Sequence, residues 1–188
     1  SRRQRQMCIR DRIQQNIEEY GYTVAASLDQ NKSKIGSLTE EALVRLKGQA
    51  DCILIEADGA KRLPLKVPGE WEPVIPDFTD LVVGVIGMDA VGQMIRESCH
   101  RPERVAAFLN KEQTDPVTEA DVIRIAVSDK ALKKAVGRRP YKIFLNKTDL
   151  MGKYESAERI GKELQEQGVH AAWGSLQGRE YYLSLIHI

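Results

Sequence analysis

The chain has 188 residues and a formal net charge of +1, because 28 Lys and Arg stand against 27 Asp and Glu. This balance argues against a nucleic-acid-binding protein, and no apolar run approaches the ~18 residues of a membrane-spanning helix, so we expect neither nucleic acid nor membrane as a partner. With 42% hydrophobic and 29% charged residues, the composition is that of a folded protein. Three cysteines are too few for a disulfide scaffold, and this favours the cytoplasm as the location of the protein.

The two ends of the chain differ in character from the part between them. Residues 1–12 hold five Arg and one Asp with no hydrophobic period, and residues 183–188 read LSLIHI. Both strings resemble translated adapter DNA, so we expect residues 1–12 and 183–188 to be non-native. The residues between them, 13–182, are expected to form a single, incomplete α/β nucleotide-binding-like domain. Without residues 1–12 the chain would have 23 basic and 26 acidic residues, a net charge of −3. The alternative is a basic arm and a C-terminal strand that docks.

Hydrophobic periodicity and turn signals predict the elements of the chain. In chain order these are a helix over 11–20, a strand over 22–28, a helix over 37–47, a strand over 52–55, a long loop over 58–79, a strand over 81–86, helices over 101–110, 118–127 and 129–136, a strand over 141–145, a helix over 155–167 and a strand over 169–173. Ser37 and Glu40 would form a capping box at the start of the helix over 37–47. Thr118 would cap the helix over 118–127, and Cys52 would lie in the core.

The order of these elements indicates the class of fold. Short apolar strands that alternate with helices are typical of an α/β domain with a mostly parallel sheet flanked by helices. The loop over 58–79 carries four prolines, which neither a helix nor a central strand accommodates. Loops of this length are uncommon unless they are functional or disordered, so this segment is a candidate functional region.

Candidate ligand-binding residues follow the predicted strands, because ligands of an open α/β sheet bind beyond the carboxyl ends of its strands. The strand over 141–145 is followed by Asn146-Lys-Thr-Asp149, the N-K-x-D pattern with which P-loop GTPases recognise guanine. Asp149 would accept hydrogen bonds from two donors of guanine that adenine lacks, while Lys147 packs along the base and Asn146 joins neighbouring loops. The alternative is a strand-to-helix turn in which Asp149 caps the helix.

The acidic residues after the strand over 52–55 are the candidate catalytic and metal-binding groups. Glu56 and Asp58, followed by Gly59, are similar to the end of a Walker B strand, where a carboxylate holds Mg²⁺ directly or through water. The amide of Gly59 could approach a γ-phosphate. The alternative is a turn acid in an ordinary strand-to-helix loop.

Basic residues near these motifs are candidates for contacts with phosphate or with a partner protein. They are Lys61, Arg62, Lys66, His100 and Arg101. Their side chains could donate to phosphate oxygens, but a solvated loop and an ordinary helix start would use the same residue types. The neighbouring Cys99 has no C-x-x-C partner, so a structural or docking role is favoured for this segment, with a substrate or metal role as the alternative.

The last predicted strand is followed by Gly174 and Ser175, which could offer backbone N–H groups to the guanine carbonyl or form an ordinary turn. The sequence contains no G-x-x-x-x-G-K-[ST] motif, and without it the β- and γ-phosphates cannot be cradled in the usual way. Either the protein is a degenerate nucleotide binder, or the phosphate-binding strand, loop and helix lie upstream of this sequence. The expected non-native character of residues 1–12 favours the second interpretation, so we expect this chain to bind GTP weakly or not at all.

Several separated segments together resemble the YqeC-like family. They are residues 51–66, 72–76, 81–92, 100–104 and 146–149. The resemblance covers roughly residues 22–180 and implies a fold similar to P-loop GTPases, with the P-loop near the N-terminus. It also implies a role as an accessory or maturation protein for selenium-dependent molybdenum hydroxylases, using Mg²⁺ with GTP or ATP.

Two functions of different classes are therefore expected. The first is a Mg²⁺-dependent nucleotide-binding maturation protein, whose partners would be a nucleotide and a molybdenum hydroxylase or a selenium-delivery protein. The second is a non-hydrolysing module that docks a partner enzyme through the proline-rich loop and the Cys99–Arg104 segment. A P-loop motif in the upstream sequence would distinguish the first from the second.

Overall fold

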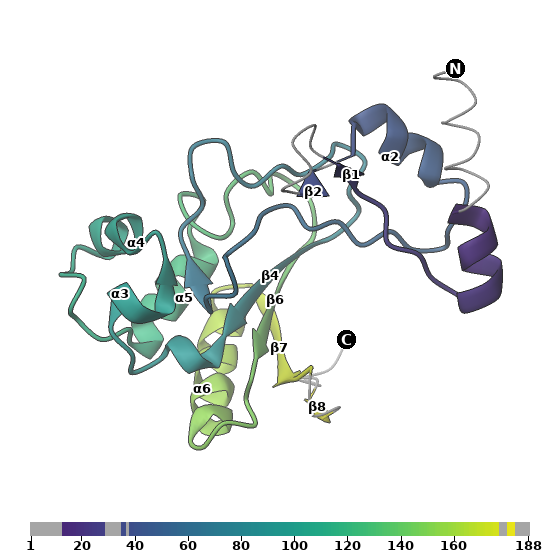
Figure 1. Cartoon of the computed structure of the whole chain (residues 1–188). Coiled ribbons are helices and arrows are strands. Elements are labelled where there is room, and N and C mark those ends of the chain that lie inside the picture. Colours follow the sequence, from purple (N-terminus) through teal and green to yellow (C-terminus); the bar gives the residue numbers. More distant parts are fainter. Residues whose placement is uncertain (1–12, 29–34, 37, 177–179, 183–188) are drawn as a thin grey trace. The chain divides into compact units, whose positions relative to one another are not determined.

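The computed structural model describes residues 13–28, 35–36, 38–176 and 180–182 (Figure 1). Chain contacts divide it into two compact units, Ser1–Ile55 and Glu56–Ile188, and each is described by itself. The expected non-native ends lie outside the described residues, and the single domain expected over 13–182 stays a prediction. Among the described residues, no helix combines the length and the apolar character needed to cross a membrane.

The first unit contains short elements. A helix covers residues 13–20, the described part of the helix predicted over 11–20. β1 (Ser27–Leu28) pairs antiparallel with β2 (Ile35–Gly36), so only the end of the strand predicted over 22–28 enters a ladder.

The second helix of this unit, α2 (Glu40–Leu46), begins later than its predicted capping box. Its N-cap is Thr39, whose Oγ1 accepts a hydrogen bond from the backbone N–H of Ala42 at 3.3 Å. Glu40 is therefore the first residue of the helix and not the third. The predicted cap, Ser37, lies outside the described residues.

The strand predicted over 52–55 is wrong. These residues carry no strand, Cys52 is exposed rather than in the core, and the Leu54 side chain is 94% exposed. An apolar run becomes a strand only where another strand supplies its ladder of hydrogen bonds. Among the strands that the structure describes, none pairs with this run.

The second unit is built around a four-stranded sheet in the order β4-β6-β7-β8. β4 (Val82–Gly87), β6 (Tyr141–Asn146) and β7 (His170–Ser175) are parallel, and β8 (Glu180–Tyr182) joins the edge antiparallel. The strands predicted over 81–86, 141–145 and 169–173 are thus confirmed. So is the α/β class with a mostly parallel sheet flanked by helices.

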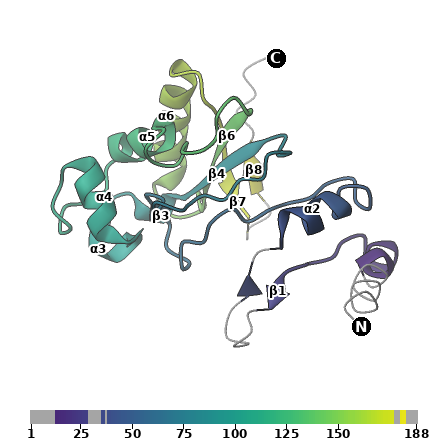
Figure 2. The same cartoon turned by 90° about the horizontal axis from the view of Figure 1, so that it is seen from above.

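Two helices cover one face of this sheet, as both views show (Figures 1 and 2). They are α5 (Glu119–Val127), capped by Thr118 as predicted, and α6 (Lys153–Glu166). The core lies between these helices and the strands, and its fully buried side chains include Ile86, Val122, Ile125, Ile143, Leu145, Ile160 and Leu164. Ile86 of β4, Ile143 and Leu145 of β6 and Trp173 of β7 point to this core, because side chains of a strand alternate between faces.

The long loop contains a short ladder that the sequence did not predict. β3 (Leu65–Lys66) pairs in parallel with β5 (Cys99–His100), which follows η1 (Met88–Ala90) and α3 (Ile95–Ser98). The helix predicted over 101–110 is present as α4 (Pro102–Leu109), with Pro102 in its first turn.

The helix predicted over 129–136 is wrong. This segment forms successive tight turns, with Ala131 N bonded to Ser128 O at 2.9 Å and Lys134 N bonded to Ala131 O at 3.0 Å. Ala135 has a left-handed backbone at φ 61°, which a regular helix excludes. The buried apolar residues of this segment, Ala131 and Val136, therefore lie in turns and not in a helix.

Candidate functional site

The carboxyl ends of three parallel strands meet at one edge of the sheet. The register pairs Gly87 with Asn146 and Asn146 with Gly174, so the segments that follow β4, β6 and β7 start side by side. The predicted Asn146–Asp149 motif and Ser175 therefore lie next to each other, as the rule for open α/β sheets anticipates.

Asn146 joins the two loops at this edge. Its Oδ1 accepts hydrogen bonds from the backbone N–H of Lys147 at 2.8 Å and of Leu176 at 3.2 Å. Thr148, which is buried, adds a backbone hydrogen bond from its N–H to the carbonyl of Gly174 at 3.4 Å. Asn146 thus fixes the N-K-x-D loop against the loop after β7, while its part in binding a nucleotide stays a prediction.

The backbone of Lys147 is strained, with φ at 65°. A non-glycine residue in the left-handed region costs on the order of 1 kcal/mol, and such residues cluster at functional sites. Its ammonium group lies 2.5 Å from Oδ2 of Asp89, which belongs to η1 just after β4. The other carboxylate oxygen of Asp89, Oδ1, is buried and has no hydrogen-bond partner in the described part of the chain.

Asp149 is exposed and is not the cap of a helix. The following helix, α6, begins at Lys153 with Gly152 as its N-cap, so the alternative in which Asp149 serves as a helix cap is wrong. The carboxylate of Asp149 therefore remains available at the surface next to Lys147. Ser175 is buried at the end of β7, with 3% of its surface exposed.

A second polar cluster holds the proline-rich loop. Lys66 is 5% exposed, and its Nζ lies 2.9 Å from Oδ2 of Asp58 and 3.0 Å from Oε2 of Glu72. It also donates to the carbonyl of Gly59 at 2.9 Å. The chain segment that carries the predicted Asp58 and Gly59 is thus anchored to a buried ammonium group. The opposite charges satisfy one another, as buried ions require.

Arg101 completes this cluster from the start of α4. Its two terminal nitrogens donate to the two carboxylate oxygens of Glu72 at 3.0 and 3.1 Å, a bidentate arrangement. Burial would raise the pKa of Glu72, but the N–H of Gly69, the ammonium of Lys66 and the guanidinium of Arg101 outweigh it and lower the pKa to about 2. Glu72 is therefore ionised under all ordinary conditions.

His100 lies beside this cluster and is 8% exposed. Burial lowers its pKa, and the cations of Arg101, Lys66 and Lys61 lower it further. The imidazole is therefore held in its neutral form near neutral pH. A neutral His does not attract a phosphate group by charge.

The remaining predicted residues lie on the exposed side of the loop. Glu56 and Gly59 are exposed, and Lys61 and Arg62 form an exposed turn in which both have left-handed backbones, at φ 50° and 65°. The proline-rich loop reaches the carboxyl edge of the sheet through Gly87, whose N–H donates to the carbonyl of Pro64 at 2.9 Å.

Three residues at these clusters, Asp89, Glu72 and Lys134, were not among the candidates predicted from the sequence. Asp89 follows the predicted strand over 81–86, and the same strand-end rule would have selected it. Glu72 sits in a proline-rich stretch with no spacing that marks it as a partner of Lys66 and Arg101. Lys134 donates to the carbonyls of Gly69 at 2.6 Å and Glu70 at 2.8 Å, across more than 60 residues of chain that no local pattern connects.

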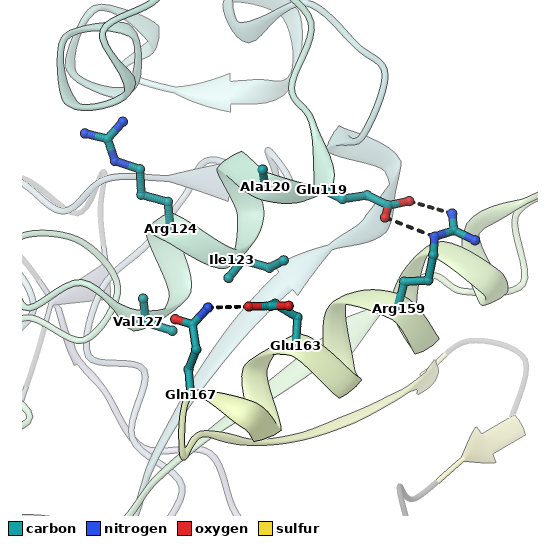
Figure 3. A pocket seen from close by; sticks show the side chains of 8 residues that line it. All are labelled: Glu119, Ala120, Ile123, Arg124, Val127, Arg159, Glu163 and Gln167. Atoms are coloured by element: carbon teal, nitrogen blue, oxygen red, sulfur yellow. Dashed lines mark hydrogen bonds and ion pairs between the residues drawn. The ribbon is translucent and has the colours of Figure 1, made fainter.

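A shallow hollow between α5 and α6 contains none of the predicted residues (Figure 3). Glu119 accepts two hydrogen bonds from Arg159, at 2.6 and 3.1 Å, and Glu163 accepts one from Gln167 at 2.8 Å. Glu119 and Arg159 thus form an ion pair, Glu163 is bonded to an uncharged amide, and Arg124 donates to the carbonyl of Leu109 at 3.2 Å. This hollow is a packing feature between two helices and not the candidate site.

The fold and the site define an α/β protein with a polar site at the carboxyl edge of a parallel sheet. The model of the family described as YqeC protein matches residues 3–103, and the chain belongs to this family. It is 28% identical over 152 residues to the "Uncharacterized protein YqeC" of Escherichia coli (strain K12). That match covers 78% of this chain and 59% of the relative's length. No solved structure matches the chain.

Proposed function

We propose that this chain carries the base-recognition part of a purine-nucleotide site, with guanine as the preferred base. The observation that supports the proposal is the double hydrogen bond to Oδ1 of Asn146, from the N–H groups of Lys147 and Leu176. It holds the N-K-x-D loop and the loop after β7 as one unit at the edge where α/β sheets bind ligands.

The residues at this edge supply the chemistry that guanine needs. The exposed carboxylate of Asp149 accepts from the N1–H and the exocyclic amine of guanine, two adjacent donors that adenine does not present. The stem of Lys147 gives an apolar surface for the base plane. A backbone N–H of the Gly174-Ser175 segment would serve the guanine carbonyl, because that of Leu176 already donates to Asn146.

Binding of phosphate and Mg²⁺ would use the segment from Glu56 to Gly59. Mg²⁺ is held by one or two carboxylates together with phosphates and water. The exposed carboxylate of Glu56 fits this role, whereas Asp58 fits it only when Lys66, 2.9 Å from its Oδ2, gives way. No group of three metal-binding side chains occurs in the described residues. Lys61 and Arg62 are the exposed cations nearest in sequence for the phosphates.

The whole protein would be longer than this chain, which spans 59% of its relative in Escherichia coli. We propose that it resembles P-loop NTPases in fold, uses GTP or ATP, and serves as an accessory protein for a selenium-dependent molybdenum hydroxylase. Its partners would then be that enzyme or a selenium-delivery protein, in the cytoplasm. Activity of the enzyme matured with and without the protein would test this role.

Base recognition can be tested in the 188-residue chain with nucleoside monophosphates, because these ligands do not need a β- or γ-phosphate site. We expect GMP to bind with a dissociation constant on the order of 1 mM, measured by NMR shift changes, and AMP to bind at least about tenfold more weakly. Asp149→Asn should abolish the preference for GMP and create one for XMP, because an amide offers a donor to the second carbonyl of xanthine.

The exposed Asp129 provides a matched control, since Asp129→Asn removes the same charge away from the site. GMP binding to this variant should equal that of the unaltered chain. Equal binding of GMP and AMP to the unaltered chain, or an Asp149→Asn variant without a gain for XMP, would refute recognition of guanine by this loop.

One observation favours a second candidate function, docking of a partner enzyme. The β3–β5 ladder and the Glu72–Arg101 pair unite the proline-rich loop with the Cys99–Arg104 segment, and the Trp71 side chain on this loop is 84% exposed. Exposed Trp residues often dominate protein interfaces. Titration of the purified partner enzyme against the chain and against Trp71→Ala would test it, because only docking through this loop predicts a difference.

A further inference from the structure

Asp89 stands next to the proposed base site and has no role in the motif itself. It lies in η1, two residues beyond β4, and its Oδ2 is 2.5 Å from Nζ of Lys147, which follows the neighbouring strand β6. Gly87 makes room for it. A Cβ on Gly87 would collide with Oδ1 of Asp89 and lie 2.6 Å from Cβ of Pro64.

This arrangement anchors Lys147 at both ends. Its backbone N–H donates to Asn146 in a left-handed conformation, and its ammonium group is held by Asp89. The four-carbon stem between these anchors therefore runs from the end of β6 toward the end of β4. The side chain is 43% exposed, so part of the stem is open to a ligand.

We propose that Asp89 is a positioning residue of the nucleotide site, which holds the stem of Lys147 in place as the surface on which the purine base lies. The inference rests on the proposed function. A Lys side chain loses much rotational freedom when it is fixed, and fixing it before the ligand arrives lowers the cost of binding.

Two features agree with a functional rather than a purely structural role for Asp89. Its Oδ1 is buried without a partner among the described residues, and its partner Lys147 keeps a strained backbone. Both features cost stability, and neither is needed to connect a strand with the segment that follows it. Such costs are commonly found where residues are arranged for a ligand.

The test is a double-mutant cycle measured by GMP binding to the 188-residue chain. Asp89→Asn keeps the shape of the side chain and removes its charge, and Lys147→Met keeps an apolar stem without the ammonium group. We expect Asp89→Asn to weaken GMP binding about fivefold in the presence of Lys147, and less than about twofold in the Lys147→Met background. Asp129→Asn is the control for loss of one negative charge.

Urea denaturation of each variant separates folding from positioning. Unchanged GMP binding by Asp89→Asn overturns the proposal, and so does an equal loss of binding in both backgrounds, which would indicate a general effect on the fold. If the unaltered chain shows no preference for GMP over AMP, the proposed function itself fails. If it shows that preference and the cycle shows no coupling, the inference about Asp89 fails alone.

Discussion

Glu72 and Arg101 form a bidentate ion pair across 29 positions of the chain, with distances of 3.0 and 3.1 Å between their nitrogens and oxygens. Through this pair the start of α4 holds the middle of the proline-rich loop. Lys66 binds the same carboxylate from within the loop, at 3.0 Å. A segment with four prolines, whose described ladder is the two-residue pairing of β3 with β5, is thus held in place largely by ion pairs.

The stability of the protein should depend on pH through Glu72. Its pKa is about 2 in the folded chain and 4.5 ordinarily, so the ionised form favours folding. This contribution is fully present above pH 4.5 and is lost as the pH falls from 4.5 toward 2, by up to about 3 kcal/mol. Urea denaturation at a series of pH values measures it.

Glu72→Gln should flatten this part of the pH profile, since the amide does not titrate. Glu70→Gln, two residues away and exposed, is the matched control and should leave the profile unchanged. An equally steep fall in Glu72→Gln would assign the acid sensitivity to other carboxylates.

Replacement of Lys66 should be strongly destabilising. Its side chain is 6% exposed and lies between the carboxylates of Asp58 and Glu72. Lys66→Met would leave two carboxylates without their shared cation, and we expect a loss of about 3 kcal/mol in the free energy of unfolding. Lys142→Met, at an exposed position of β6, should cost less than about 0.5 kcal/mol. Similar losses for both variants would contradict a buried ion cluster.

The three parallel strands of the sheet could be predicted from the sequence because they are apolar runs that pair with one another, whereas the antiparallel β8 was not predicted. The predicted bounds of the strands over 81–86, 141–145 and 169–173 differ from the observed ones by only one or two residues at their ends. The run over 52–55 looks the same in sequence, yet it is no strand, because a strand requires a neighbour and the periodicity of one segment contains no information on its neighbour. The two-residue β3, which lies among prolines, could not be predicted either, because its ladder depends on its partner β5.

The candidate site likewise contains residues whose position the order of the elements predicts and residues whose position it does not predict. The position of Asn146–Asp149 at a strand end followed from the order of the elements, and so could that of Asp89. The pairing of Lys66 with Asp58 and Glu72 could not be predicted, because it depends on how an irregular loop folds back on itself. The sequence therefore identified Asp58 and Lys66 as candidates, but neither their pairing nor Glu72.

The absence of a side chain at Gly87 should be required for the carboxyl edge of the sheet. Gly87→Ala would place a Cβ 2.6 Å from Cβ of Pro64, and against Asp89, so either the loop or the Asp89–Lys147 pair must shift. We expect a loss of about 1–3 kcal/mol in the free energy of unfolding. Gly59→Ala is the control, since its Cβ would meet nothing nearer than 3.8 Å. Equal stability of the two variants would show that this edge adapts freely.

The hydrogen bonds of Asn146 should govern the order of both loops at the site. Asn146→Ala removes the acceptor of the N–H groups of Lys147 and Leu176, so both amides should exchange with solvent about tenfold faster or more. Asn146→Asp keeps an oxygen at the same place and should retain most of the protection of Leu176. Amide exchange followed by NMR reports each N–H separately. If Asn146→Ala leaves the Leu176 amide protected as before, the two loops are joined by other contacts, such as the bond from Thr148 to Gly174.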